Sequence, residues 1–318
     1  MLDLIAIGEP LVELAAESSG RLGEVEHFRR GWGGDTANCV LAAARLGGAC
    51  SYITRVGDDE FGRAFVAMLE RNGVDASQVG IDTAHHTGVY FVSYTDERQH
   101  RFTYLRRDSA ASHLAGGDID PGYVGAARVL HASGISQAIS RSCAGAIETA
   151  MTIARAAGTT VSYDANVRPA LGTAESLRGN FARALSLADI MFVSEEDIAY
   201  LYDDSPVEAA LDRILGEQPT LAVAKLGARG CLIGDDAGTR LHVPGWTVEA
   251  VDATGAGDAF SAGFILSWLR GAAPEEAGRY ANAVGALTAA GIGAIAPQPD
   301  HDQVAVFIER QTQARRTP

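Results

Sequence analysis

The stretch Asp252-Ala253-Thr254-Gly255-Ala256-Gly257-Asp258-Ala259-Phe260 decides how the fold of this chain is interpreted. Its two glycines flank one alanine, so the backbone can turn tightly and lie close to a ligand. The residues from Ala256 to Leu269 are apolar at helical spacing and contain no proline, which predicts a helix that begins at or just after the glycines. A helix start offers unpaired N–H groups and a partial positive charge to an anion such as a phosphate.

Asp258 falls in the first turn of that helix, beside the expected anion site. A carboxylate there does not bind phosphate, but it can accept the proton of a hydroxyl that attacks one. A structural interpretation competes with this one: Gly255 and Gly257 make a strand-to-helix turn, and Asp258 caps the helix. The stretch alone leaves both interpretations open.

Length and composition indicate an ordinary globular protein. The 318 residues suffice for one large α/β domain or two small ones, and 47% of them are hydrophobic and 21% charged. The formal net charge of −14 argues against broad binding to nucleic acid or to an anionic membrane. An anionic substrate would therefore be bound by a few local cations and N–H groups.

The cysteines and the N-terminus favour a cytoplasmic protein. Cys39, Cys50, Cys143 and Cys231 form no CxxC pair and have no metal-ligand spacing, so buried thiols in a reducing compartment are expected. The first nine residues lack the basic region and the long apolar run of a signal peptide. No apolar stretch approaches membrane-spanning length.

Strand and helix patterns alternate along most of the chain, which indicates a mostly parallel sheet covered by helices. Strands are expected at 4–7, 51–56, 129–132, 160–163, 190–193 and 220–224, with antiparallel edge strands at 231–234 and 240–243. Helices are expected at 36–46, 63–72, 141–157, 175–187, 256–269, 275–290 and 302–311, and residues 311–318 are expected to be a frayed tail.

A second glycine-rich turn, Gly31-Trp32-Gly33-Gly34-Asp35, precedes the helix expected at 36–46. Asp35 and Asn38 are placed there to hydrogen-bond a ligand. The equally weighted alternative is a plain helix cap made by Asp35.

The regular alternation breaks between residues 87 and 107. Two strand-like runs at 89–94 and 101–105, joined by polar residues 95–100, predict a hairpin. With the alternating runs at 11–14 and 25–28 it would form a small sheet, a lid or a dimerisation flap, from about 10–30 and 87–107. Tyr90 and Tyr104 would present polar tips with Arg106 and Arg107 at the edge, although ordinary strand aromatics and solvated arginines are the alternative. The remaining histidines of this region show no metal-ligand spacing and are expected in surface loops: His85, His86 and His100.

Ligands of parallel α/β sheets bind at the carboxyl ends of the strands. Seven polar or glycine residues follow directly after expected strands, which predicts one shared cleft: Asp164, Asn166, Arg168, Ser194, Lys225, Gly227 and Asp252.

Five motifs occur in a characteristic order: Gly33-Gly34-Asp35-x-x-Asn38, Gly57-Asp58-x-x-Phe61-Gly62, Asp164-x-Asn166-x-Arg168-Pro169, Lys225-x-Gly227-x-x-Gly230 and Asp252-x-Thr254-Gly255-Ala256-Gly257-Asp258. With them the chain resembles the ribokinase-like (PfkB) carbohydrate kinases from Ile5 to about Ile308. The resemblance implies one three-layer α/β/α domain over residues 1–318, with a mostly parallel central sheet and a small β-sheet lid. It also implies ATP and Mg²⁺ as cofactors and a homo-oligomer formed through the lid.

Within that family the chain is most similar to the 2-keto-3-deoxygluconate kinases, through Gly-Gly-Asp-Thr-Ala-Asn and the run from Arg101 to Ser112. The implied reaction phosphorylates the terminal primary hydroxyl of the sugar acid to the 6-phosphate. Asp258 would be the general base beside the amides of Gly255, Ala256 and Gly257. The acceptor would be bound by Gly34, Asp35, Asn38, Tyr90, Tyr104, Arg106 and Arg168.

The resemblance further implies an ATP site and a monovalent-cation site. ATP would be bound by Asn166, Ser194, Lys225, Gly227, Gly230, Gly255, Gly257 and Asn282. Asp252 and Thr254 match positions that help to hold a monovalent cation, which would be K⁺. The chain departs from the family pattern at Ser194-x-x-Asp197, where Asn-x-x-Glu is common, and at Gly172, where an aromatic residue is frequent.

Three alternatives compete with this function. A fructokinase or another ribokinase-like sugar kinase would use the same chemistry on a different acceptor. A dinucleotide-dependent oxidoreductase would need GxGxxG after the first strand, and Gly8-Glu9-Pro10 does not match it. A catalytically inactive sugar- or nucleotide-binding regulator would not need Asp258.

Overall fold

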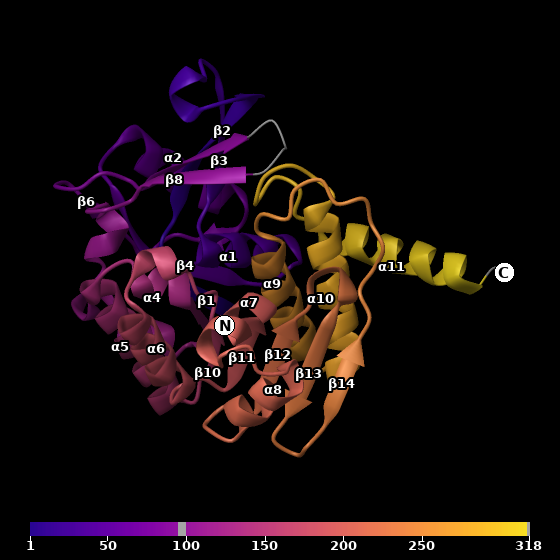
Figure 1. Cartoon of the computed structure of the whole chain (residues 1–318). Coiled ribbons are helices and arrows are strands. Elements are labelled where there is room, and N and C mark those ends of the chain that lie inside the picture. Colours follow the sequence, from indigo (N-terminus) through magenta and orange to yellow (C-terminus); the bar gives the residue numbers. More distant parts are fainter. Residues whose placement is uncertain (95–99, 317–318) are drawn as a thin grey trace.

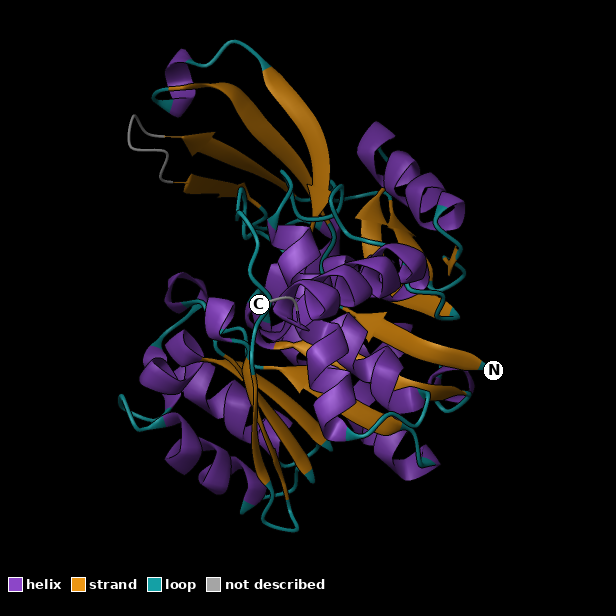
Figure 2. Ribbon diagram, turned by 90° about the vertical axis from the view of Figure 1, so that its right-hand side faces the viewer, coloured by secondary structure: helices purple, strands orange, loops and turns teal. Residues whose placement is uncertain are grey.

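Strand β1 (Leu2–Ile7) lies inside the main sheet, and its side chains account for the layered architecture. Leu4 and Ala6 belong to the hydrophobic core on one face of the sheet, whereas Ile5 and Ile7 belong to the core on the other face. A parallel strand buried on both faces is apolar at every position. The computed structural model describes residues 1–94 and 100–316, and it confirms the three-layer α/β fold, with helices on both faces of the sheet (Figure 2).

The main sheet is parallel except at one edge. Its order is β14-β13-β12-β11-β10-β9-β1-β4-β5, and β6 also pairs with β4. Among the described residues of this sheet, only the pairs β12–β13 and β13–β14 are antiparallel, as expected for the edge strands. In addition to β1, the main sheet consists of β4 (Cys50–Gly57), β5 (Val74–Asp75), β6 (Val79–Asp82), β9 (Ala127–Ser133), β10 (Thr160–Asp164), β11 (Ile190–Ser194), β12 (Leu221–Lys225), β13 (Cys231–Asp235) and β14 (Arg240–Val243).

Helices α1, α2, α9 and α10 supply the core on the face of Leu4, and α5 to α8 supply the core on the face of Ile5. Helix α11 projects from the body toward the C-terminus (Figure 1). The helices are α1 (Asp35–Arg45), α2 (Glu60–Arg71), α3 (Pro121–Val124), α4 (Gly134–Ala138), α5 (Arg141–Ala157), α6 (Ala174–Leu185), α7 (Glu195–Leu201), α8 (Val207–Leu215), α9 (Ala256–Leu269), α10 (Pro274–Ala289) and α11 (His301–Arg316).

A second, four-stranded sheet stands apart from the main one, at the top of Figure 1. This small sheet has the order β3-β2-β7-β8 and consists of β2 (Leu11–Ser19), β3 (Phe28–Gly33), β7 (Val89–Tyr94) and β8 (His100–Leu105). Strands β7 and β8 are antiparallel with Tyr90 opposite Tyr104, as expected of the hairpin. The polar connection expected there lies at 95–99, outside the described residues.

Four expectations about local structure are wrong. Gly31-Trp32-Gly33 belongs to strand β3, because Trp32 packs against Phe65 and pairs with Val12. Of the run 25–28 only Phe28 is in a strand. His100 begins strand β8 and so does not lie in a loop. Helix α11 continues through the expected frayed tail as far as Arg316, and residues 317–318 lie outside the described part.

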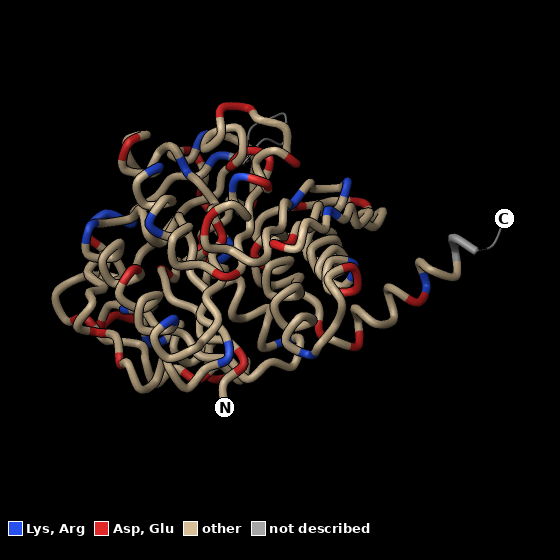
Figure 3. The backbone as a smooth tube through the Cα atoms, turned by 90° about the horizontal axis from the view of Figure 1, so that it is seen from below, with Lys and Arg blue, Asp and Glu red and all other residues tan. Residues whose placement is uncertain are grey.

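Other surface features agree with the composition. Lys and Arg are interspersed with Asp and Glu along the backbone in the view of Figure 3. All four cysteines are free and buried. Within residues 1–94 and 100–316, no helix is both long enough and apolar enough to cross a bilayer.

Candidate active site

Two cavities meet at the first turn of helix α9, at the edge of the sheet where the parallel strands end. The larger cavity, about 360 Å³, lies between the end of β12 and helices α9 and α10, with Lys225, Gly257 and Asn282 in its wall. The smaller cavity, about 120 Å³, contains Gly255 and Asp258. A group bound at the N-terminus of α9 would therefore be in reach of ligands in both cavities.

Gly255 makes this arrangement possible, because it is the N-cap of α9 with a φ of 74° in the left-handed region. A Cβ atom at this position would approach the carbonyl oxygen of Ala294 to 2.7 Å. The N–H of Ala256 donates to the carbonyl of Ala253 at 3.2 Å, but no side chain caps the first turn of α9, so the other N–H groups there remain available to an anion. Asp258 therefore does not cap the helix.

The Asp258 carboxylate is held from two sides. The amide of Asn38 donates to Oδ2 at 2.8 Å, and the amide of Asn166 is 3.4 Å from Oδ1. Burial, and then the negative charges of Asp35 and Asp164, raise the pKa of Asp258 to about 7. A carboxylate with a pKa near neutrality is a much better proton acceptor for a hydroxyl than an ordinary aspartate.

A buried ion pair lies behind the wall of the larger cavity, which Lys225 lines. Lys225 Nζ donates to Asp164 Oδ2 at 2.6 Å, and the Ser261 hydroxyl donates to the same oxygen at 3.1 Å. Burial disfavours the charge of Lys225, but Asp164 outweighs this and raises the lysine's pKa. Asp164 Oδ1 is buried and has no hydrogen-bond partner among the described residues.

Asp35 lies in the first turn of α1, and the N-cap is Gly34, so the interpretation of Asp35 as a plain helix cap is wrong. The carboxylate accepts hydrogen bonds from the hydroxyls of Ser133 and Ser136. Both serines lie at the end of β9 or just beyond it, so the strand edge fixes the orientation of Asp35 toward the smaller cavity.

The small sheet closes the other side of the smaller cavity. Tyr90 is buried and donates its hydroxyl to Glu13, and its ring stacks on Tyr104 at 5.8 Å between centroids. Tyr104 is 46% exposed, so its face remains open toward the cavity mouth. The guanidinium of Arg106 lies over the Tyr104 ring at 5.2 Å.

The two arginines expected at the acceptor differ in their surroundings. Arg106 forms a buried ion pair with Glu9, whose pKa is raised to about 7, mainly by burial. Arg168 is exposed, and among the described residues it has no acidic partner. It donates to the carbonyl of Val167, and its positive charge acts on Tyr104.

The structure divides the expected site residues between the cavities. Those that line the smaller cavity are Gly34, Asp35, Asn38, Tyr90, Tyr104, Arg106, Asn166, Thr254, Gly255 and Asp258. Those that line the larger cavity are Lys225, Gly227, Gly230, Ala256, Gly257 and Asn282. Asn166 and Gly255, which the resemblance assigned to ATP, thus line the smaller cavity and not the larger one. Arg168 lies outside both linings.

Two residues expected to bind ATP, Ser194 and Asn282, form hydrogen bonds within the protein. Ser194 and Asp197 form the capping box of α7, and Ser194 lines neither cavity. Asn282 donates to the carbonyls of Val243 and Pro244, and so fixes the loop after β14.

Asp252 binds its own loop. It accepts from the backbone and hydroxyl of Thr254 and from the backbone of Gly293.

Glu9 and Phe102 line the smaller cavity, but the sequence interpretation missed both. A signal for Glu9 was available, because a carboxylate directly after a buried strand is unusual. Phe102 gave no comparable signal, because aromatic residues are common in strands.

The comparisons with known proteins agree with this geometry. The model of the pfkB family of carbohydrate kinases matches residues 1–301. This chain belongs to the PfkB family of carbohydrate kinases.

The PfkB relatives include enzymes for different acceptors. The chain is 36% identical to 2-dehydro-3-deoxygluconokinase of Thermoproteus tenax over 293 residues, which is 90% of this chain and 88% of that protein. It is 34% identical to Fructokinase-1 of Oryza sativa subsp. japonica over 318 residues, 96% and 97% of the two chains. A protein assigned as Ribokinase II of E. coli, solved in complex with ATP and Mg²⁺, superposes with a TM-score of 0.91 at 28% identity, covering 98% of this chain and 100% of that one.

We predict that Gly255→Ala disrupts the first turn of α9 in this PfkB kinase. Gly271→Ala is the matched control, because Gly271 also has a positive φ, 85°, but a Cβ atom there would meet nothing within 4 Å. Gly271→Ala should lower the free energy of unfolding by roughly 1–2 kcal/mol and leave turnover intact. Gly255→Ala should cost more stability and lose most turnover. Urea unfolding and steady-state kinetics check both; equal effects of the two changes would contradict the prediction.

Proposed function

We propose that this PfkB kinase transfers the γ-phosphoryl group of ATP to the terminal primary hydroxyl of 2-keto-3-deoxygluconate, giving the 6-phosphate. The observation that carries the proposal is Asp258, whose carboxylate has a raised pKa beside the uncapped N-terminus of α9, between the two cavities. In this proposal Asp258 is the general base for the acceptor hydroxyl.

The larger cavity suits a nucleotide. Its wall is mostly small and apolar, which fits an adenine ring, and its volume lies at the lower end for ligand pockets. Lys225 and the amides of Gly257 at the α9 terminus are placed at the end of that cavity nearest Asp258, where the phosphates would lie. The E. coli relative bound to ATP and Mg²⁺ supports this assignment.

Asp164, which pairs with Lys225 of the larger cavity, offers a donor that fits Mg²⁺. Asp164 Oδ1 is a buried carboxylate oxygen with no hydrogen-bond partner in the described residues, and hard oxygen atoms are the ligands that Mg²⁺ prefers. In the proposed complex Asp164 would hold Mg²⁺ directly or through its water shell, and the ion would neutralise charge on the phosphates.

We also propose K⁺ at the loop that carries Asp252 and Thr254. The Asp252 carboxylate joins this loop to the backbone of Gly293, so that it fixes the segment just before the N-terminus of α9. A cation bound there would act on the position of the anion site rather than on the acceptor.

The proposed transfer depends on position and charge more than on covalent chemistry. The hydroxyl attacks the γ-phosphorus in line, Asp258 accepts its proton, and the N–H groups of Gly255 and Gly257 stabilise the charge on the transferred group. The small sheet would cover the acceptor and exclude water, which would limit hydrolysis of ATP. Phe102, Tyr104 and Leu105 are exposed on this sheet, and a homo-oligomer formed through it would cover them.

The acceptor is assigned from the cations near the cavity mouth. A sugar acid carries a carboxylate, which arginine binds with two parallel hydrogen bonds. Arg168 has no acidic partner in the described chain and lies close enough to Tyr104 to affect its titration. A neutral sugar would have no use for this charge.

Fructose is the second candidate acceptor, and one observation favours it. The other arginine, Arg106, already has a carboxylate partner in Glu9, so it has less to gain from a carboxylate on the substrate. The 34% identity to the rice fructokinase supports the same alternative.

The variant Asp258→Asn tests the proposed base. We expect kcat to fall by roughly 10²- to 10⁴-fold, because the amide cannot accept the proton. The dissociation constant for ATP should stay within a small factor of the wild-type value, since Asp258 lines the other cavity. Steady-state kinetics and nucleotide titration provide the two measurements. Unchanged kcat would remove Asp258 from the mechanism.

The pH dependence follows from the raised pKa. Asp258 must be deprotonated to act, so kcat/KM should increase with pH and level off above an apparent pKa of about 7. Glu9 also has a pKa of about 7, and Glu9→Gln is therefore the control. If the increase of kcat/KM with pH reflects deprotonation of Asp258, it persists in Glu9→Gln. If the increase disappears in Glu9→Gln, it reflects Glu9 instead.

Arg168→Ala distinguishes the acceptors. Loss of a charged hydrogen bond should raise KM for 2-keto-3-deoxygluconate by roughly 10- to 100-fold and leave KM for fructose nearly unchanged. Arg71→Ala is the control, because Arg71 is exposed at the end of α2 and lines neither cavity. The assay should compare 2-keto-3-deoxygluconate, its galactose-derived epimer and fructose. A higher kcat/KM for fructose would exclude the sugar-acid assignment.

A further inference from the structure

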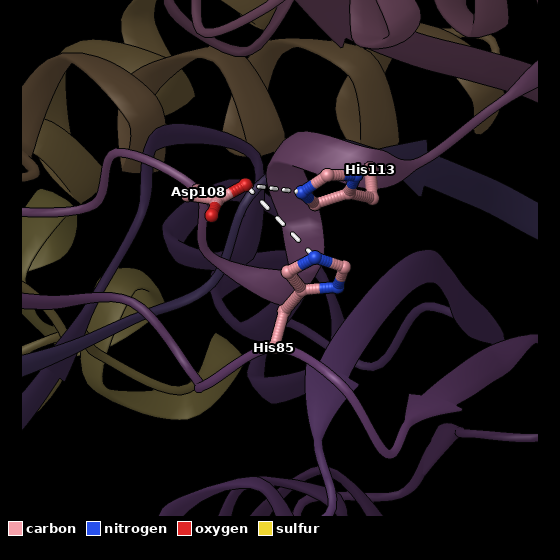
Figure 4. A group of neighbouring side chains, drawn as sticks. All are labelled: His85, Asp108 and His113. Atoms are coloured by element: carbon pink, nitrogen blue, oxygen red, sulfur yellow. Dashed lines mark hydrogen bonds and ion pairs between the residues drawn. The ribbon is translucent and has the colours of Figure 1, made fainter.

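Three metal-ligating side chains converge outside the active site, although sequence spacing gave no sign of it. They are His85, Asp108 and His113, and their ligand atoms all lie within 4.8 Å of one another. Figure 4 shows both imidazole rings presenting a nitrogen toward the Asp108 carboxylate. The expectation that His85 is an ordinary loop histidine is therefore incomplete.

The three residues come from two segments of the chain, one after β6 and one after β8, that meet beside the small sheet. His85 lies in the loop after β6, Asp108 in the turn after β8, and His113 at the end of a short 3₁₀ helix, residues 110–113. Strand β6 pairs with β4 of the main sheet, whereas β8 belongs to the small sheet. A shared ligand at these residues would join the two sheets.

The distances suit a first-row divalent metal. Asp108 Oδ1 is 2.7 Å from Nε2 of His113 and 3.9 Å from Nε2 of His85. Two ligands at tetrahedral zinc, with bonds near 2.1 Å, are about 3.4 Å apart. The observed separations lie on both sides of this value. The two imidazole rings stack, with centroids 3.7 Å apart and 18° between their planes, so one ring has to turn out of the stack for both nitrogens to reach one ion.

His85 is already oriented as a ligand. Its Nδ1 is 3.1 Å from both carboxylate oxygens of Asp82, and Asp82 is fixed in turn by Arg55 at 2.9 Å and by the backbone N–H of Ala84. An Nδ1–H that donates to a carboxylate leaves the lone pair on Nε2, the atom that faces Asp108. This carboxylate–histidine arrangement accompanies most histidine ligands of zinc.

We propose that His85, Asp108 and His113 form a site for Zn²⁺ or a similar transition-metal ion, which fastens the base of β8 to the main body. Two imidazoles and one carboxylate favour zinc over Mg²⁺ and Ca²⁺, which prefer oxygen ligands. The ligands are accessible, with 27% of the His85 side chain and 40% of the His113 side chain exposed. Water would complete the coordination.

Because of its location, a bound ion would affect how the small sheet moves. Asp108 follows two residues after Arg106, which contacts Glu9 in the acceptor cavity. A metal bound to Asp108 would limit the movement of this segment relative to the loop after β6. The proposal does not depend on which sugar is the acceptor, or on whether Asp258 is the base.

Metal binding is the direct test, on the full chain without a histidine tag and with excess Mg²⁺ present. Equilibrium dialysis should give one Zn²⁺ per chain, and Co²⁺ should produce the visible absorption of a nitrogen- and oxygen-ligated ion. His113→Gln and Asp108→Asn should each raise the dissociation constant for Zn²⁺ by at least about 10-fold, the effect expected even for an outer ligand. Both side chains are substantially exposed, so these changes leave the core intact.

His86→Gln is the matched control, because this neighbouring histidine directs its Nδ1 to the carbonyl of Thr87. It should bind zinc as the wild type does. Zn²⁺ should also raise the melting temperature of the wild type and of His86→Gln but not that of His113→Gln. Absence of zinc binding by the wild type, or equal affinity in all four proteins, would overturn the proposal.

Discussion

The site depends on keeping a carboxylate next to a helix N-terminus while other carboxylates crowd it. Asp258 would be stabilised as an anion by the amides at the start of α9, yet burial and the charges of Asp35 and Asp164 oppose this. These opposing effects leave the pKa of Asp258 at about 7. Lys225 offsets part of the negative charge, but its ammonium is directed to Asp164 rather than to Asp258. Asp258 is therefore not half of an ion pair, which leaves its carboxylate open for the proposed role as a base.

The rest of the fold serves this balance. Asp35 and Asn38 come from α1, Asn166 follows β10, and Lys225 ends β12, so the groups around Asp258 come from three different elements. Their convergence requires that the carboxyl ends of the parallel strands meet at one edge of the sheet. Helix α9 is fixed on the sheet by its own Phe264, which is buried and packs edge-to-face on Phe192 of β11.

The sequence predicted the main sheet and the helices well because local signals and burial agree there. Helix α5 begins and ends as expected, since Ser140 caps it and Gly158 follows it. Prediction was poor where tertiary contacts override local chemistry. Glycines usually end strands, but Gly31 and Gly33 stay in β3 because the strand is held on Leu11 to Ala16 of β2.

Prediction of the site residues was limited in the same way, because contacts between distant parts of the chain could not be read from local sequence. Residues around the glycine motif were predictable because each follows a strand or begins a helix, and such positions share one edge. Glu9 was missed because its role depends on an arginine about a hundred residues away.

His85, Asp108 and His113 were also missed, because their spacing follows no linear metal motif and only the fold brings them together.

In the proposed function, the choice of acceptor depends on whether Arg106 stays paired with Glu9 or pairs with a carboxylate of the substrate. If the small sheet moves as a unit when it closes, Arg106 moves with β8, whereas Glu9 stays at the end of β1. A substrate carboxylate would then compete with Glu9 for the same guanidinium. Because the pKa of Glu9 is near 7, protonation of Glu9 would release Arg106 at little cost. A sugar acid would therefore have to displace Glu9 to bind Arg106, whereas Arg168, which has no such competitor among the described residues, would be the cation that favours an acid in the proposed function.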